Sequence, residues 1–520
     1  MGRGSSLSRR HRQYLTGGVF TLAGANLICR ILGFAFKVPL ANLIGAEGMG
    51  YYGIAWQVYG AVTSLAMSGL PGAFAWIVAS APGETRRTAL RGCLPMFVLT
   101  GFVSAVSLAA LSGVLCGAAG SPQAYPAVLI LAPNAFCAAL EAAYRGYFQG
   151  CGNLRPAAKA QTAEAVVKLL IGTAAAWALH RRGYPAPVVA AGAMIGVTVG
   201  TVVSMTLFAV SAHRAPGIAE RAAFPELRRR LFRAALPLSV GSVLLNLMSA
   251  ADTAVILRCL RFTGMSDGSA AGAYGAYTGM AMTVCGLPSA VTSAVCAGVV
   301  PTVAACFEPD QRRVRLSASA VARLDRAFRL CGAITLFAGA MFAFLPKELL
   351  SAVFSRGGDV AVAAPLLRLA APVAALSAVC AVSGAMLHGA GEMTFPVISS
   401  IVSGLVQLGV TLCCIRFAGM GVSGAPVGAV AGLAIHAVLN LAACARKCGY
   451  RPPILRSFIL PLLCAVASGA AAGFVYRALC PIFSGRVSAC AAVMSAAALC
   501  AVLLVVCGVI RRSDLTEKRK

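Results

Sequence analysis

Two cations, Arg30 and Lys37, fall within the first long apolar stretch of this 520-residue chain. A charged side chain near the middle of a bilayer costs at least ~2.5–3.5 kcal/mol, so it is expected to face a partner or a wet cavity. The two residues are seven apart, or two helical turns, and therefore share one helix face. Such a pair suits an anionic ligand with several acceptor oxygens. The alternative is that Lys37 only snorkels to the membrane interface while Arg30 pairs locally.

Two further charged pairs, Glu141 with Arg145 and Glu164 with Lys168, have i,i+4 spacing with the acid first, which is the favourable order. In the simpler interpretation each pair neutralises itself, so that its helix tolerates an apolar environment. In the other interpretation Arg145 helps to bind an anionic ligand. Glu164 and Lys168 would then serve ion coupling or pairing between the two halves of the protein.

Asp252 is a carboxylate inside an apolar stretch with no opposite charge within four residues, and Arg258 is its nearest cation in sequence. Such an acid could bind Na⁺ or carry a proton that drives transport. It could equally pair with an arginine of the other half, such as Arg368, which also falls in a predicted span, or with Arg30. Arg368 is in addition a candidate for the anion-binding group.

No pattern in the chain indicates an enzyme or a resident cofactor. A Walker A motif, an HExxH motif, a CxxC motif and a Ser/His/Asp constellation are all missing from the sequence. Most of the 20 cysteines lie inside apolar runs, where cysteine acts as a small hydrophobic residue. We therefore expect no catalytic site, no bound metal and no cofactor, with Na⁺ or H⁺ only as a coupling ion.

The composition requires a membrane protein. The chain is 59% hydrophobic and only 12% charged, with a mean hydropathy of +0.82; an average soluble domain is about 25% charged. Apolar stretches of about 20 residues cross a bilayer as helices. We predict an all-α polytopic membrane protein with about 14 spans, near residues 14–36, 48–79, 93–118, 124–149, 157–180, 186–211, 231–257, 272–306, 327–346, 361–387, 394–417, 422–445, 455–477 and 487–510.

The net charge of +28 comes from cations that punctuate these stretches instead of gathering on one face, which argues against a nucleic-acid partner. With the N-terminus inside, 31 Lys and Arg residues fall in inside segments and 10 in outside segments. This bias follows the positive-inside rule. It predicts an even number of spans and two cytoplasmic termini, in a membrane whose lipids are the surrounding partner.

The chain contains an internal repeat. Ser68-Gly69-Leu70-Pro71 in the second predicted span corresponds to Cys285-Gly286-Leu287-Pro288 in the eighth, six spans later. An offset of six spans gives two parallel lobes around a central site, an architecture that suits alternating access. Gly69, Pro71, Gly286 and Pro288 are candidate hinges, and a static bend is the alternative. The predicted parts are a basic N-terminal segment (1–13), the first lobe (14–213), a basic linker (214–233), the second lobe (234–446), two appended spans (447–510) and a basic tail (511–520).

The stretch from Arg30 to Phe34, with Lys37 and the run from Ala41 to Tyr52, resembles the opening of the stage V sporulation protein B family. The run from Arg145 to Gly150 resembles it too. That family belongs to the MOP superfamily, with the lipid II flippase MurJ, the Wzx flippases and the MATE exporters as relatives. The resemblance implies two six-helix lobes in a V shape. It also implies movement of an undecaprenyl-pyrophosphate-linked sugar from the inner to the outer leaflet, in peptidoglycan or spore-cortex assembly.

The resemblance and the basic intramembrane residues together predict a flippase for a lipid-linked cell-wall oligosaccharide such as a lipid II-like precursor. Arg30 and Lys37 would attract its pyrophosphate. We expect a monomer in the bacterial cytoplasmic membrane, with cell-wall synthases as candidate partners. The main alternative is a MATE-type cation-coupled drug antiporter. A membrane-embedded glycosyltransferase and a non-transporting scaffold are further alternatives.

Overall fold

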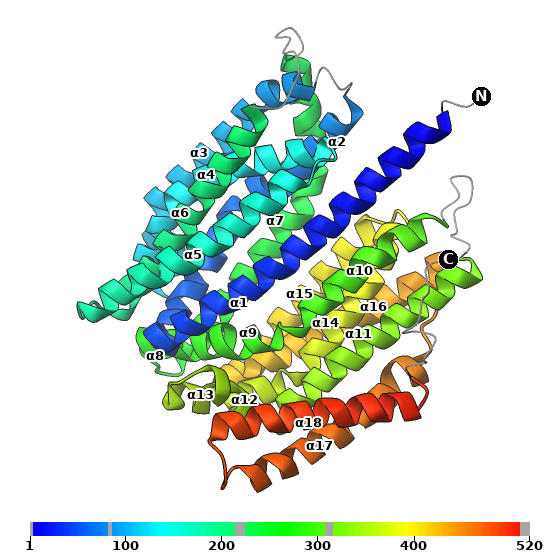
Figure 1. Cartoon of the computed structure of the whole chain (residues 1–520). Helices are drawn as coiled ribbons and strands as arrows, with labels where there is room; N and C mark the ends of the chain where they lie inside the picture. The colour runs from blue at the N-terminus through cyan, green and yellow to red at the C-terminus, as the bar shows by residue number, and fades with distance from the viewer. Residues whose placement is uncertain (1–3, 82–85, 214–223, 307–315, 510–520) are drawn as a thin grey trace. The chain divides into compact units, whose positions relative to one another are not determined.

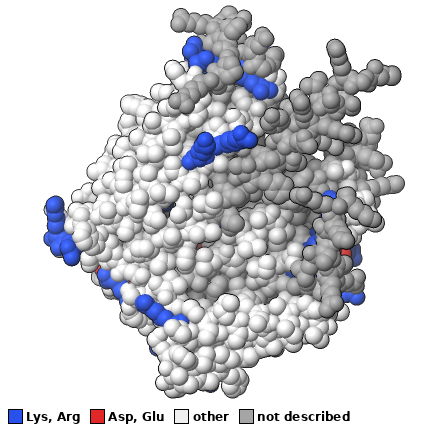
Figure 2. Space-filling model, viewed as in Figure 1, with Lys and Arg blue, Asp and Glu red and all other residues white. Residues whose placement is uncertain are grey.

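The computed structural model describes residues 4–81, 86–213, 224–306 and 316–509, and every regular element within them is a helix (Figure 1). Much of the predicted basic linker, from 214 to 223, and the predicted basic tail from 511 to 520 lie outside the described residues. Large apolar side chains stay exposed on the outside of the helices, for example Leu99, Phe102 and Val114 on a single helix. On the face drawn in Figure 2, Lys and Arg side chains are few and lie apart. Such a surface suits lipid as its solvent.

Within the described residues, twelve helices are long and apolar enough to cross a membrane. A bent pair, Asp267–Cys285 with Pro288–Ala304, adds a thirteenth candidate span. The prediction of an all-α polytopic membrane protein with about 14 spans is therefore confirmed. The small difference arises near the N-terminus, because the first predicted span and the first half of the second lie in one helical element, α1 (Gly4–Ser64). Gly45 kinks α1 with φ 70° and ψ −176°, a backbone conformation that favours glycine.

The chain divides into two compact units. Unit 1 comprises 1–258 and 267–271, and unit 2 comprises 259–266 and 272–520. After α1, unit 1 continues through the short π-helix η1 (Leu65–Gly69) and the short η3 (Pro122–Ala124). Its other helices are α2 (Leu70–Ser80), α3 (Arg86–Ala118), α4 (Tyr125–Gly150), α5 (Arg155–Arg181), α6 (Ala186–His213) and most of α7 (Phe224–Phe262).

Helices α3 to α6 lie side by side in unit 1, and small residues set how closely they approach (Figure 1). A Cβ at Gly196 on α6 would lie 2.3 Å from the Cα of Gly172 on α5. A Cβ at Gly146 on α4 would lie 2.8 Å from the carbonyl oxygen of Pro71 on α2. These glycines therefore bring neighbouring backbones into direct contact, the usual way helices pack in a membrane.

Unit 2 is built from the remaining helices. Its elements begin with α8 (Asp267–Gly275), which straddles the division between the units, and the π-helix η4 (Ala276–Ala281). The rest are α9 (Met282–Cys285), α10 (Pro288–Ala304), α11 (Ala318–Phe344), α12 (Pro346–Val353), α13 (Gly357–Leu369), α14 (Ala371–Gly389), α15 (Thr394–Leu412), η5 (Cys413–Phe417), η6 (Gly421–Ser423), α16 (Gly424–Cys448), η7 (Leu455–Ile459), α17 (Leu460–Leu479) and α18 (Gly485–Val506).

A large part of the core of unit 2 lies between α10, α11, α14 and α16. Phe328 stacks on Tyr450 with ring centroids 5.9 Å apart. The hydroxyl of Tyr450 donates a hydrogen bond of 2.6 Å to Asp325, which ties the segment after α16 to α11. Desolvation by burial, together with this carboxylate acceptor, raises the pKa of Tyr450, so the phenol keeps its proton.

The repeated Gly-Leu-Pro segments coincide with interruptions of regular helix. In unit 1 the π-helix η1 ends at Gly69, and Pro71 lies in the first turn of α2. In unit 2 the π-helix η4 precedes α9, and the axis bends by 50° between α9 and Pro288 at the start of α10. Close packing also favours glycine at position 69, because a Cβ there would lie 1.8 Å from the Oγ of Ser239. Both units therefore contain a break at the repeated segment.

A further predicted span also differs from the structure. The tenth, predicted near 361–387, is divided at Ala370 into α13 and α14. Arg368 therefore lies in the last turn of a short 13-residue helix instead of in a long apolar span. Its Nε donates to the carbonyl oxygen of Ala343 at 2.9 Å, where it satisfies an end of α11.

Candidate functional site

A polar cavity of about 200 Å³ lies between helices of unit 1. The second half of α1 forms one wall, and residues of η1, α4, α5, α6 and α7 complete it. Its polar lining comprises Tyr59, Thr63, Ser64, Asn134, Glu141, Arg145, Glu164, Thr201 and Asn246. Polar groups buried between membrane-spanning helices require partners or a ligand, so this cavity is the candidate functional site.

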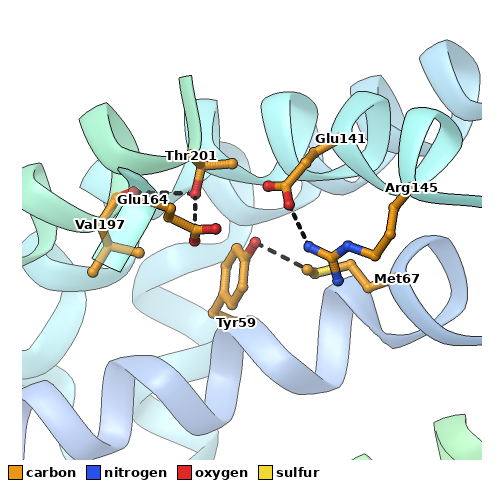
Figure 3. A network of polar contacts seen from close by, with 7 residues as sticks. All are labelled: Tyr59, Met67, Glu141, Arg145, Glu164, Val197 and Thr201. Carbon is orange, nitrogen blue, oxygen red and sulfur yellow. Dashed lines mark hydrogen bonds and ion pairs between the residues drawn. The ribbon is translucent and has the colours of Figure 1, made fainter. Parts of the chain in front are cut away.

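The hydroxyl of Tyr59 makes two hydrogen bonds in the cavity, and the one to Met67 is drawn in Figure 3. It accepts a 3.0 Å hydrogen bond from Asn134 Nδ2 and donates to Met67 Sδ at 3.6 Å. In the figure, Glu164 lies on one side of the Tyr59 ring and Arg145 on the other. Tyr59 therefore links α1 to α4 and stands between the charged groups of the cavity.

Glu141 and Arg145 form the ion pair that their i,i+4 spacing predicts. Only 2% of Glu141 is exposed, so its carboxylate depends on the guanidinium for its charge. The Nε–H of Arg145 is itself buried and has no hydrogen-bond partner in the described part of the chain. The guanidinium thus neutralises Glu141 and keeps one donor available for another acceptor.

Glu164 faces the same cavity from α5. Thr201 on α6 lies 3.5 Å from its Oε1 and 3.1 Å from the carbonyl oxygen of Val197, and the hydroxyl can donate to either acceptor (Figure 3). The close approach of the two helices makes this contact possible, since a Cβ at Gly200 would lie 2.9 Å from the carbonyl oxygen of Glu164. The two carboxylates, Glu141 and Glu164, both lie within electrostatic range of the Tyr59 hydroxyl.

The contacts of Lys168 differ from the predicted ones. Its i,i+4 spacing suggested an ion pair with Glu164, but no such pair forms among the described residues. The Lys168 ammonium lies instead 5.1 Å from the ring centroid of Phe36 and 5.1 Å from that of Trp56. Aromatic faces attract a cation through the ring quadrupole, so the two rings hold this charge without a carboxylate contact.

The two cations of the first stretch differ in exposure, although both lie on α1. Lys37 is half-buried on α1 and lies within electrostatic range of Lys168. Arg30 is exposed on the same helix. Neither is part of the cavity lining, although Lys37 and Lys168 place positive charge on the same unit. Of the predicted anion-binding residues, only Arg145 lines the cavity.

Two other predicted residues lie elsewhere. Asp252 is half-buried on α7 and is not part of the cavity lining. Arg368 belongs to unit 2, where it bonds the end of α11 as described above. The predicted ligand and coupling residues are therefore only partly brought together, with Arg145 and Glu164 in one cavity and Lys168 one helical turn from Glu164.

Several site residues do not stand out in the sequence. Tyr59, Asn134 and Thr201 supply three of the neutral polar groups of the cavity. Phe36 and Trp56 are the two rings beside Lys168 and form its aromatic cage. The available signal was a lone amide, Asn134, in the middle of the apolar α4. The other four are common in membrane spans, so their residue types alone do not mark a site.

The chemistry of the cavity follows from its donor set. The described residues contain no group of three or more His, Cys, Asp and Glu side chains that could hold a metal ion. The cavity offers two carboxylates, the Arg145 guanidinium and the amide of Asn134, whose Nε–H and Oδ1 respectively have no hydrogen-bond partner among the described residues. It can bind an anionic oxygen at Arg145, and its carboxylates can take up a proton or a small cation.

The fold matches solved structures of membrane transporters. The lipid II flippase MurJ in an inward closed conformation superposes with a TM-score of 0.70 at 14% identity, covering 93% of this chain and 97% of that chain. A multidrug resistance MATE family transporter of the MOP superfamily, in an inward-facing conformation, gives 0.62 at 17% identity, over 81% and 94%. At such identities the likeness shows the fold. The protein is thus a polytopic membrane protein that shares its fold with these two transporters.

The sequence comparisons give the family. Residues 15–307 match the polysaccharide biosynthesis protein family, and the chain belongs to it. Stage V sporulation protein B of Bacillus subtilis (strain 168) is 26% identical over 532 positions, which cover 97% of each chain. The resemblance found in residues 30–52 and 145–150 is thereby confirmed.

Proposed function

We propose that the protein is a flippase that moves an undecaprenyl-pyrophosphate-linked cell-wall oligosaccharide from the inner to the outer leaflet by alternating access. Membership in the polysaccharide biosynthesis family and the MurJ-like fold support a lipid-linked substrate. The relative named for stage V of sporulation supports a role in peptidoglycan or spore-cortex synthesis. The bacterial cytoplasmic membrane, two cytoplasmic termini and the two six-helix lobes with two appended spans belong to the same proposal.

The observation that carries the proposal is the Arg145 guanidinium in a cavity within the membrane-spanning helices. Its buried Nε–H has no hydrogen-bond partner within the described chain, and a pyrophosphate oxygen is a strong acceptor for such a donor. Lys37 and Lys168 add positive charge to the same unit. Arg30, exposed on α1, and Arg368 in unit 2 are proposed to attract the anionic head at other stages of its passage.

The carboxylates of the cavity suggest how transport could be driven. Glu141 is paired with Arg145 in the structure. When Glu141 or Glu164 takes up a proton or Na⁺, the charge of the cavity becomes more positive and Arg145 can turn to the pyrophosphate. Asp252 is a second candidate for the same coupling role. The interruptions at Gly69–Pro71 and Gly286–Pro288 are proposed to absorb the accompanying bending.

The deciding experiment is depletion of the protein followed by analysis of undecaprenyl-linked precursors on each leaflet. We expect the intact precursor to accumulate on the cytoplasmic side. Complementation with Arg145→Ala should fail. Complementation with Arg477→Ala, which removes a cation from the last turn of α17 in unit 2, should succeed and is the control. Unchanged precursor distribution after depletion would contradict the proposal.

A second candidate function is a MATE-type cation-coupled antiporter. The MATE-like fold and the two cavity carboxylates, Glu141 and Glu164, favour it specifically, since acidic groups suit cationic drugs. It predicts that expression raises resistance to cationic dyes and that Glu164→Gln removes this resistance. The flippase proposal predicts no such resistance.

A further inference from the structure

Unit 2 contains a second cavity, of about 440 Å³, whose lining includes none of the transport residues above. Four helices form it, and each contributes residues four apart, so that one face of every helix points inward. The helices are α10, α14, α15 and α16, which pack together within this unit (Figure 1). The size falls in the range of about 300–1,000 Å³ that is typical of small-molecule sites.

The polar groups of this cavity converge from three helices. His388 comes from α14, Ser400 from α15, and His436 and Asn440 from α16. Ser400 Oγ lies 3.4 Å from Nε2 of His436 and donates to the carbonyl oxygen of Pro396 at 2.7 Å. Small residues such as Ala297 and Ala385 supply much of the remaining lining, so the imidazoles, the hydroxyl and the amide provide most of its polar contacts.

Asn440 supplies the observation that indicates a ligand. It is 1% exposed, and its Oδ1 accepts a 2.7 Å hydrogen bond from Ser399. Its Nδ2 is buried and has no partner in the described part of the chain. An unpaired amide donor in an apolar interior is unfavourable, and an acceptor supplied by a ligand would offset this cost.

The charge of the lining limits what the ligand can be. Among the described residues, no Asp, Glu, Lys or Arg lines the cavity, and the two imidazoles are its titratable groups apart from the thiols of Cys296 and Cys380. A metal ion or a strongly charged group would have no counter-charge here. A neutral group with several hydroxyl or carbonyl oxygens and apolar C–H faces matches both the polar side and the apolar wall.

We propose that this cavity of unit 2 binds a saccharide, with Asn440 Nδ2 and the imidazoles of His388 and His436 bonding its hydroxyl or acetamido oxygens. The site goes beyond the flippase proposal, because binding at equilibrium does not require transport. The saccharide can come from a free sugar or from a lipid-linked one. Both sources present the same sugar hydroxyl and carbonyl groups, and the two arms of the experiment distinguish them.

The test uses the full-length protein in lipid nanodiscs prepared without glycoside detergents. Binding of N-acetylglucosamine is titrated by saturation-transfer NMR, and a second arm uses N-acetylglucosamine attached to a short polyprenyl pyrophosphate. Gly384→Leu is the key variant, because a Cβ at Gly384 meets no atom within 4 Å and its side chain would fill the cavity. Gly409→Leu on α15 is the matched control, because it also has open space but does not line the cavity.

We expect Gly384→Leu to raise the dissociation constant of the sugar at least tenfold, and Gly409→Leu to leave it unchanged. His436→Ala should raise it about two- to tenfold, the effect of one lost hydrogen bond. The arm that binds more tightly identifies the source of the saccharide. The proposal is overturned if neither probe binds, if Gly384→Leu binds as the wild type does, or if inorganic phosphate displaces the sugar. Depletion of the protein can still reveal a flippase in each of these cases.

Discussion

The hydroxyl of Tyr59 accepts a 3.0 Å hydrogen bond from the side-chain amide of Asn134, and this contact joins α1 to α4 inside an apolar bundle. Asn134 is 2% exposed and Tyr59 is 3% exposed, so bulk water does not reach the contact. Both residues line the unit 1 cavity together with the Glu141–Arg145 pair. The hydrogen bond therefore fixes the wall of the cavity on the side of α1.

The first prediction separates folding from binding at that pair. Arg145→Ala should lower thermal stability strongly, because removing one partner of a buried ion pair costs about 3–5 kcal/mol. The double variant Glu141→Gln with Arg145→Gln removes both charges, so its stability should recover in large part. Thermal unfolding in detergent measures the effect.

Transport by the same variants decides what Arg145 does. If Arg145 binds the pyrophosphate, the double variant stays inactive although it is folded. Recovery of both stability and complementation in the double variant would mean that Arg145 only neutralises Glu141.

The second prediction concerns the aromatic cage of Lys168. Lys168→Gln should destabilise unit 1 by about 0.5–2 kcal/mol, because a cation beside two rings loses its favourable interaction. In a background with Trp76→Phe and Trp177→Phe, it should also shift the fluorescence of Trp56. The control is Arg181→Gln, which removes a cation 4.5 Å from the ring centroid of the half-exposed Trp177 and should have a smaller effect on stability. Equal effects of the two changes would refute a special role for the cage.

The third prediction tests the contact between α5 and α6. Gly196→Ala should destabilise the protein by about 1–3 kcal/mol or more, because its Cβ would lie 2.3 Å from the Cα of Gly172. Gly113→Ala on α3 meets no atom within 4 Å, so it should be neutral or slightly stabilising through higher helix propensity. Thermal unfolding of the two variants under identical conditions measures the difference. Equal stability would contradict the close packing described here.

The fourth prediction is a pH dependence that arises from Glu392, which lies between α14 and α15. Lys447 Nζ donates to Glu392 Oε2 at 2.6 Å, and this hydrogen bond lowers the pKa of Glu392 below its ordinary value of 4.5. A lowered folded-state pKa means that the stabilisation is fully present above about pH 4.5 and is lost as the pH falls through the folded-state value. Because Lys447 is largely exposed, the contribution should be at most about 1 kcal/mol.

Thermal unfolding of the wild type and of Glu392→Gln between about pH 3 and about pH 8, a range that includes the ordinary carboxyl pKa, measures this effect. The difference between them should be constant near neutral pH and should shrink at the acid end. Glu226→Gln, which removes the exposed pair with Arg230, is the control and should differ less from the wild type at neutral pH. A difference that grows on acidification would contradict the assignment.

The fold was largely predictable because it depends on composition and spacing. Apolar stretches of about 20 residues are long enough to span a bilayer, and they marked most of the helices. The kink at Gly45 was visible only as a gap between two predicted spans. The break at Ala370 was missed because the apolar run continues through it, and only backbone geometry separates α13 from α14.

The contacts of the site were predictable only where two charged residues lie one turn apart on the same helix. Glu141 and Arg145 are neighbours on one helix, so their spacing was sufficient. Lys168 followed the same spacing to Glu164 but lies beside two rings from α1, a contact that depends on how α1 and α5 pack. Tyr59 and Asn134 are 75 residues apart, and no feature of either segment indicates the other.

Phe36 and Trp56 lie on opposite sides of the kink at Gly45, and the ammonium of Lys168 lies near the rings of both. One charge on α5 therefore contacts the two arms of α1 at the same time and restrains the angle between them. A glycine at the bend permits a range of angles, and this electrostatic restraint selects one of them. The bend of the longest helix in unit 1 thus depends on a contact with a neighbouring helix. We expect a change in the charge of Lys168 to alter that bend.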